Sequence, residues 1–154
     1  MANTQAMATS FKVEMLNGLH AFGTSVVRGA TTADSFKAAL YLTTATISAS
    51  STVYTATGEV SGTGYTAGGV DLTGAVDWIA PTSSGTTAFS TCTASLVYTT
   101  VTLTTAFDAV MIYNSTQGNR MVSCHTFGAQ TITAGTLTLT MPVNDATTGL
   151  IRIA

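Results

Sequence analysis

Residues 136 to 141 alternate strictly between threonine and a hydrophobic residue, in the order Thr-Leu-Thr-Leu-Thr-Met. Successive side chains of an extended strand point to opposite faces, so this spacing separates the hydroxyls from the hydrophobes. The same period of two runs through residues 36–42 and 96–103, and residues 107–113 are hydrophobic on both faces, as in a central strand. The chain is therefore predicted to be mostly β.

Shorter strands are expected at residues 121–127 and 150–153, and turn signals separate the strands. The polar residues 114–119 have the composition of a loop that closes a hairpin. The glycine-rich stretch 58–69 predicts a long loop or a bulged edge, because glycine adopts positive φ without strain. Residues 81–87 predict a second exposed loop.

Several short strands separated by turns indicate an antiparallel β-sandwich, and the order of its strands stays open between jelly-roll and immunoglobulin-like. The length of 154 residues is that of a single β domain, 1–154. Residues 9–18 predict a short N-terminal helix, with Ser/Thr at its start and Gly18 at its end. Residues 1–8 predict an extended N-terminal arm that becomes ordered by lying on a neighbouring subunit.

Charged residues make up only 8% of the chain, against about 25% in an ordinary soluble domain. Threonine supplies about a fifth of all residues, far above its usual share. The five scattered basic residues and the net charge of −2 do not form the basic patch that nucleic-acid binding needs. A surface of hydroxyls and small apolar groups instead favours packing against neighbours, so we expect a homo-oligomer or a larger ordered assembly.

The N-terminal residues show no pattern of a signal peptide, and no run of apolar residues approaches the length of a membrane span. We therefore expect a protein that is made and used without export or contact with a membrane. Cys92 and Cys124 are expected to be reduced, partly buried thiols instead of a disulfide.

The histidines, His20 and His125, lie in no recognisable catalytic context, and Cys124 and His125 point to opposite faces of a strand. We therefore expect no catalytic residues, no metal site and no cofactor. A hydrolytic or sugar-binding patch near Asp71 and Asp77 is the weaker alternative, because solvated loop carboxylates are the more common case.

Several stretches of the sequence together span nearly the whole chain and carry a family resemblance: residues 10–12, 18–22, 36–41, 54–69, 137–142 and 149–154. On these stretches the chain resembles a family of small virion structural proteins of tailed bacteriophages. The family includes capsid decoration (cement) proteins and neck or tail accessory proteins. The resemblance implies a β-sandwich or jelly roll, and it carries over no functional residues.

The resemblance implies a protein of the virion, assembled in the cytoplasm of the host bacterium, with the major capsid protein or other virion proteins as partners. The expected role is to stabilise the shell by bridging neighbouring capsid subunits. A neck or tail component and a carbohydrate-binding module for host recognition are the alternatives. Tyr54, Tyr65 and Trp78 are the candidate interface residues, because aromatic side chains concentrate interface energy. Placement in the core is the alternative for each.

Overall fold

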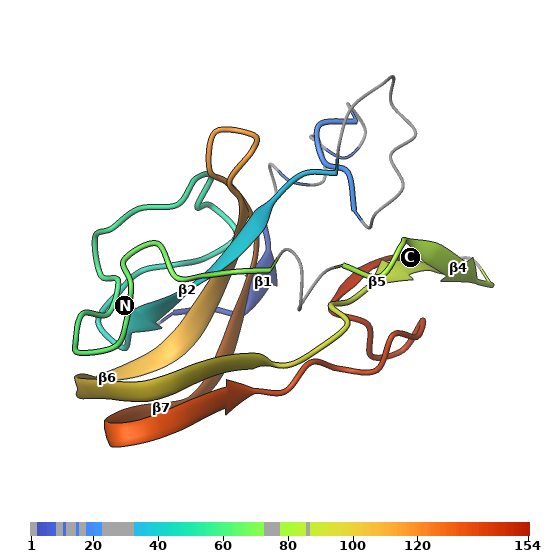
Figure 1. The fold of residues 1–154 in the computed structure, drawn as a ribbon. Coiled ribbons are helices and arrows are strands. Elements are labelled where there is room, and N and C mark those ends of the chain that lie inside the picture. The colour runs from blue at the N-terminus through green and yellow to red at the C-terminus, as the bar shows by residue number, and fades with distance from the viewer. Residues whose placement is uncertain are drawn as a thin grey trace.

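The computed structural model describes residues 3–8, 11, 15, 18–22, 33–72, 78–85 and 87–154. These residues form two antiparallel sheets, in agreement with the prediction of a mostly β chain (Figure 1). The first sheet has the order β1-β7-β6-β2-β3 and the second the order β4-β5-β8. The strands are β1 (Ala6–Met7), β2 (Phe36–Leu42), β3 (Val70–Asp71), β4 (Thr82–Ser84), β5 (Thr87–Ser90), β6 (Leu96–Asn114), β7 (Arg120–Leu139) and β8 (Ile151–Ile153).

Strand β2 has the bounds that the period of two predicts, and it lies between β6 and β3. Its pairing with β6 runs from Phe36 opposite Asn114 to Leu42 opposite Phe107. Five of the seven residues of β2 are buried, and the other two are half-buried. The strand is therefore covered on both faces and forms part of the core.

A long hairpin of β6 and β7 dominates the larger sheet, and residues 115–119 connect its strands, close to the predicted loop. The prediction of separate strands over 96–103 and 107–113 is wrong, because β6 continues through residues 104–106. The pairing shifts register several times in this region, and Thr100 and Ala134 have positive φ. Such irregularities bend a strand without ending it, and Figure 1 shows both strands curving sharply.

The second sheet contains a hairpin where the sequence indicates an exposed loop. Residues 82–84 and 87–90 are the strands β4 and β5, and Gly85 turns between them with a φ of 58°. Serine is common in turns and threonine in strands, so this mixture of the two did not distinguish a loop from a hairpin. Strand β8 pairs with β5 and confirms the expected final strand.

The described part of the N-terminal arm, residues 3–8, packs against the rest of the chain. Ala6 and Met7 pair with β7, and the buried Asn3 donates a hydrogen bond to the Leu42 carbonyl. The backbone groups of the arm therefore find partners within the fold. Most of the predicted helix over 9–18 lies outside the described residues.

The core joins the larger sheet to the segments before β2 and before β4. Phe36 of β2 contacts Phe22 and Trp78 through rings at centroid distances of 5.1 and 5.5 Å. The fully buried large side chains are Tyr41, Phe11, Phe36, Phe107, Leu40, Leu72, Leu96, Leu103, Met111, Ile112, Met121 and Val101. Cys92 and Cys124 are buried and are not joined to each other in a disulfide, as expected.

Candidate functional site

The three candidate interface residues occupy two different environments. Trp78 is only 2% exposed and lies in the core against Phe22, so it is removed from the candidate contact surface. Burying the large apolar surface of this ring stabilises the fold. Tyr54 and Tyr65 are half-buried and pack against the core cluster.

The hydroxyls of Tyr54 and Tyr65 both donate to the carboxylate of Glu59. Tyr54 reaches Oε2 at 2.6 Å and Tyr65 reaches Oε1 at 2.7 Å. The backbone N–H of Gly68 donates to Oε1 at 2.7 Å as well. Glu59 is therefore held by three donors from its own loop, and such bonds to an ionised acceptor are stronger than neutral ones.

Two of the other tyrosines fasten the same loop to the sheet, and the third joins β6 to β2. Tyr41 donates to the carbonyl of Thr55, Tyr98 to that of Ala38 and Tyr113 to that of Gly68. Burial raises the pKa of all five tyrosines, and the nearby Glu59 charge adds to the effect. We call Glu59 and these tyrosines, Tyr41, Tyr54, Tyr65, Tyr98 and Tyr113, the tyrosine cluster.

Glycines allow the loop of the tyrosine cluster to lie directly on the sheet. Gly69 has a φ of 78°, and a Cβ there would overlap the carbonyl oxygen of Ala38 on β2. A Cβ at Gly62 would likewise overlap the carbonyl of Thr102 on β6. The glycines of stretch 58–69 therefore serve close backbone approach as well as turning. The sequence signal for the cluster was this stretch beside Tyr54 and Tyr65.

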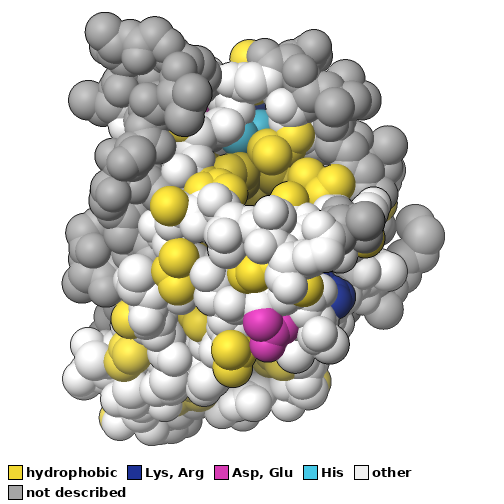
Figure 2. Space-filling model, turned by 90° about the vertical axis from the view of Figure 1, so that its right-hand side faces the viewer, with side chains coloured by type: hydrophobic (Ala, Val, Ile, Leu, Met, Phe, Trp, Pro, Cys, Tyr) yellow, Lys and Arg dark blue, Asp and Glu magenta, His cyan; other side chains and the backbone are white. Residues whose placement is uncertain are grey.

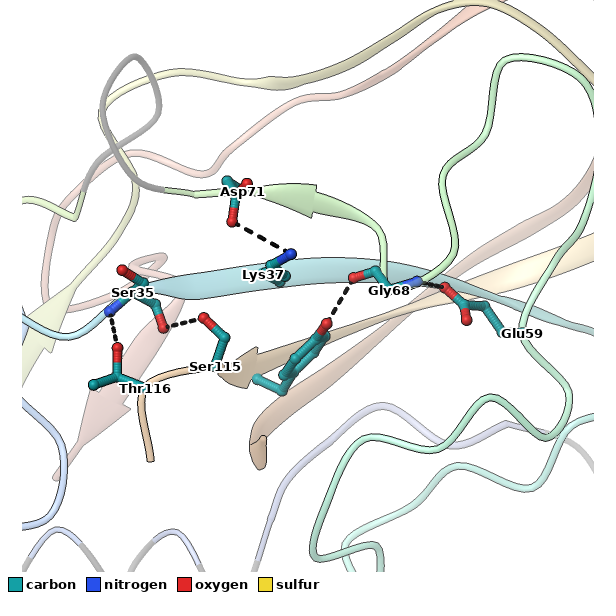
Figure 3. A network of polar contacts seen from close by, with 8 residues as sticks. Ser35, Lys37, Glu59, Gly68, Asp71, Ser115 and Thr116 are labelled. Atoms are coloured by element: carbon teal, nitrogen blue, oxygen red, sulfur yellow. Dashed lines mark hydrogen bonds and ion pairs between the residues drawn. The ribbon is translucent and has the colours of Figure 1, made fainter. Parts of the chain in front are cut away.

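A second polar network lies at the far end of β2. Buried Asn114 donates to Asp34 at 2.9 Å and lies 3.1 Å from the His20 ring nitrogen Nδ1. Beside it, Ser115 donates to the carbonyl of Ser35, as Figure 3 shows. These bonds tie the end of the β6–β7 hairpin to the start of β2.

The carboxylates that the structure describes have separate partners. Asp71 pairs with Lys37 at 3.7 Å on the surface, and Figure 3 shows this pair apart from the Glu59–Gly68 contact. Asp108 accepts from Asn3 and Asp145 from the turn N–H groups of residues 147 and 148. These described acids therefore do not converge in a pair like that of a glycosidase. Asp77 of the alternative hydrolytic patch lies outside the described residues.

A cavity of about 650 Å³ lies between the curved β6–β7 hairpin and the C-terminal segment. Its wall includes Leu137 and Leu139, and the Ser123 hydroxyl lies 2.9 Å from Nε2 of His125. Burial lowers the pKa of His125 to about 4 and raises the pKa of Cys124 to about 12. At neutral pH the imidazole and the thiol are therefore both uncharged. In the described ranges, no three potential ligand side chains converge to hold a metal ion.

The outer surface of the hairpin is uncharged and rich in hydroxyls. Residues 96–107 and 121–139 contain no Asp, Glu, Lys or Arg. The exposed side chains there include Thr99, Thr100, Thr104, Thr105, Thr131, Thr133, Thr136 and Thr138. Charged side chains are also sparse on the face shown in Figure 2, where hydrophobic side chains gather around a hollow.

Within the part of the chain that the structure describes, no helix has the length and apolar character needed to cross a membrane. Comparisons with protein-family models, with curated proteins and with solved structures found no match to this chain.

Proposed function

We propose that this protein is a structural protein of a bacteriophage particle and not an enzyme. In this role it decorates the capsid and stabilises the shell by bridging neighbouring capsid subunits. The observation that carries the proposal is the uncharged, threonine-rich outer surface of the β6–β7 hairpin. An isolated protein relies on surface charge for solubility, whereas a subunit of an assembly covers such a surface with neighbours.

The stretches that resemble phage virion proteins support the proposal, because they coincide with parts that define the fold. Residues 36–41 lie in β2, and residues 54–69 form the loop of the tyrosine cluster on that strand. The hydroxyl of Tyr65 accepts the N–H of Leu40 at 2.9 Å and joins the two stretches directly. The resemblance therefore concerns residues that depend on one another.

The mechanism is the burial of modest hydroxyl and apolar patches across several capsid subunits. Each contact is weak, and avidity from simultaneous contacts supplies the binding strength. The internally bonded tyrosine cluster keeps the loop of residues 54–69 in one conformation, which reduces the entropy lost on binding. Tyr54 and Tyr65 are half-buried, so their exposed edges remain candidates for contact.

We further propose that the two sheets are the layers of a β-sandwich. The mixture of a long bent hairpin and short strands is compatible with sheets that pack face to face. A jelly-roll or an immunoglobulin-like order of strands is the finer form of this proposal. An experimental structure of the protein in its particle tests both.

The test of function is a reconstruction of purified particles, compared with particles assembled without this chain. The proposal expects density for the chain at many icosahedrally related positions over the capsid lattice, and earlier heat disruption of particles that lack it. Density at the portal vertex or along the tail would replace the decoration role by a neck or tail role. Absence of the chain from the particle would overturn the virion proposal altogether, and a glycan-binding screen would then test the host-recognition alternative.

A further inference from the structure

Among the described residues, only a short part of the outer edge of strand β7 is paired with another strand. Strand β1 pairs with β7 only at Ser123 and Cys124. Beyond Cys124, no strand among the described residues pairs with this edge, while β6 pairs with the inner edge as far as Leu139. An edge strand of this kind presents unpaired N–H and C=O groups that can bind another strand.

Natural edges are protected by charged side chains, by proline, by β-bulges or by being very short. The extra residues of β7 lie between Thr126 and Gln130 and between Ile132 and Gly135, so the segment 136–139 beyond them has none of these devices. The other edges among the described strands follow this rule. Asp71 of the two-residue strand β3 pairs with Lys37 of β2, and β4 and β8 are each three residues long. Residues 121–141 contain neither a charge nor a proline, and Pro142 follows directly. The edge is therefore suited to pairing up to the point where proline ends the ladder.

The sequence of this edge is also its own complement. Residues 136–140 read Thr-Leu-Thr-Leu-Thr in either direction, with Thr138 at the centre. In an antiparallel pair of two such strands, Thr138 faces Thr138, Leu137 faces Leu139, and Thr136 faces Thr140. Thr–Thr pairs and pairs of hydrophobes are both favourable across strands. When a strand pairs with itself, like charges that lie opposite each other destabilise the pair. This segment has no charges, so that penalty does not arise.

The two faces of the strand fit this pairing. Thr136 and Thr138 are exposed on the outer face, whereas Leu137 is buried and Leu139 is half-buried on the inner face. Leu137 and Leu139 line the cavity of about 650 Å³. Pairing with a second copy would therefore continue the hydrophobic inner face from one chain to the next without exposing it.

We propose that two copies of this chain associate through β7, in an antiparallel pair with its two-fold axis at Thr138. The five-stranded sheets of the two copies then form one continuous sheet. This association is expected of the purified chain. The proposal of a dimer therefore does not depend on the proposed role in a virion.

Sedimentation velocity of the purified protein tests the pairing. We expect a dimer for the wild type and a monomer for Thr138→Lys, because two lysines then face each other at the axis and weaken association by roughly tenfold or more. Thr104→Lys is the matched control, since Thr104 is exposed on β6 away from the open edge. This control should sediment as the wild type does.

Mixing the variants makes the test specific for the two-fold axis. Thr138→Glu alone should also be monomeric, and an equal mixture of Thr138→Lys and Thr138→Glu should recover the dimer through opposite charges. A wild type that is monomeric at every concentration, a Thr138→Lys protein that still dimerises, or a mixture that stays monomeric would each overturn the proposal.

A cysteine cross-link decides the question where a charged variant does not fold. Thr138→Cys in the otherwise native chain should form a disulfide between two copies on mild oxidation, because residues that face each other across strands have Cβ atoms about 5 Å apart. Thr104→Cys should not cross-link. Equal cross-linking of the two variants would contradict a two-fold axis at residue 138.

Discussion

Glu59 and Tyr65 are joined by a hydrogen bond of 2.7 Å from the tyrosine hydroxyl to carboxylate Oε1. The same hydroxyl oxygen accepts the N–H of Leu40 from the middle of β2. A loop carboxylate is thus connected through one side chain to the backbone of a buried strand. The stability of the loop and that of the sheet therefore depend on each other.

Glu59→Gln should destabilise the protein by about 1–3 kcal/mol, since charge-assisted bonds from Tyr54, Tyr65 and Gly68 are lost or weakened. Urea denaturation measures the change in the free energy of unfolding. Asp71→Asn is the matched control, because its exposed ion pair with Lys37 is expected to contribute about 1 kcal/mol or less. Equal losses of unfolding free energy for the two substitutions would show that the hydrogen bonds of Glu59 contribute no more to stability than an exposed ion pair.

Stability should fall as the pH rises above 10. Burial raises the pKa of Tyr113 to about 12 and the pKa values of Tyr41 and Tyr98 still higher, above the ordinary 10.0 of the unfolded chain. The unfolded state therefore releases protons first, and the stability present below pH 10 is lost as the pH rises through the folded-state values. Absorbance at about 295 nm follows tyrosinate formation. Tyrosine ionisation near pH 10 in a protein that remains folded would contradict this expectation.

Stability should also fall as the pH drops from about 6.5 to 4. Burial lowers the pKa of His125 from 6.5 to about 4, so the unfolded chain binds a proton in this range and the folded chain does not. The loss is at most about 3 kcal/mol at the lower end of the range. Urea midpoints of the wild type and of His125→Gln at pH 7, 5.5 and 4 measure it. The variant should show a smaller slope with pH, and parallel slopes would count against burial of this imidazole.

Gly69→Ala should be more harmful than Gly118→Ala. Both glycines have positive φ, at 78° and 66°, so each substitution carries a backbone cost of about 1–2 kcal/mol. Only at Gly69 does the added Cβ overlap a backbone carbonyl, that of Ala38, whereas nothing lies near Gly118. The overlap should add about 1–3 kcal/mol. Thermal unfolding of both variants separates the two contributions, and similar losses would mean that the loop moves away from β2 without cost.

The period of two predicted β2 and the alternation of residues 136–139, because one face of each segment is buried and the side-chain period reports burial directly. It did not predict that β6 is continuous. Register shifts around Thr100 and Phe107 interrupt the alternation while the strands stay paired, so the pattern there reads as an end of a strand.

The glycine-rich stretch beside Tyr54 and Tyr65 indicated part of the tyrosine cluster, but the complete cluster was not predictable from the sequence. Tyr54 and Tyr65 lie near Glu59 in the chain, whereas Tyr113 comes from the part of β6 that pairs with β2. Tyr98 comes from a part of β6 outside that pairing, and its hydroxyl donates to the carbonyl of Ala38. Trp78 was misplaced among the contact candidates, since an aromatic residue next to a glycine-rich region gives no period that distinguishes core from surface. The ring contacts of Trp78 with Phe22 and Phe36 show that it lies in the core.

Because Trp78 is buried away from the tyrosine cluster, the tryptophan and the tyrosines absorb and emit from two different regions of the protein. The single tryptophan lies where the segment around Cys92 meets the ring of Phe36, while all five tyrosines gather around Glu59. Fluorescence emission therefore reports on the junction near the second sheet, and near-ultraviolet dichroism of the tyrosines reports on the loop over β2. Coincidence of these two signals during denaturation is the signature of a single cooperative unit, and a gap between them would resolve the chain into two folding units.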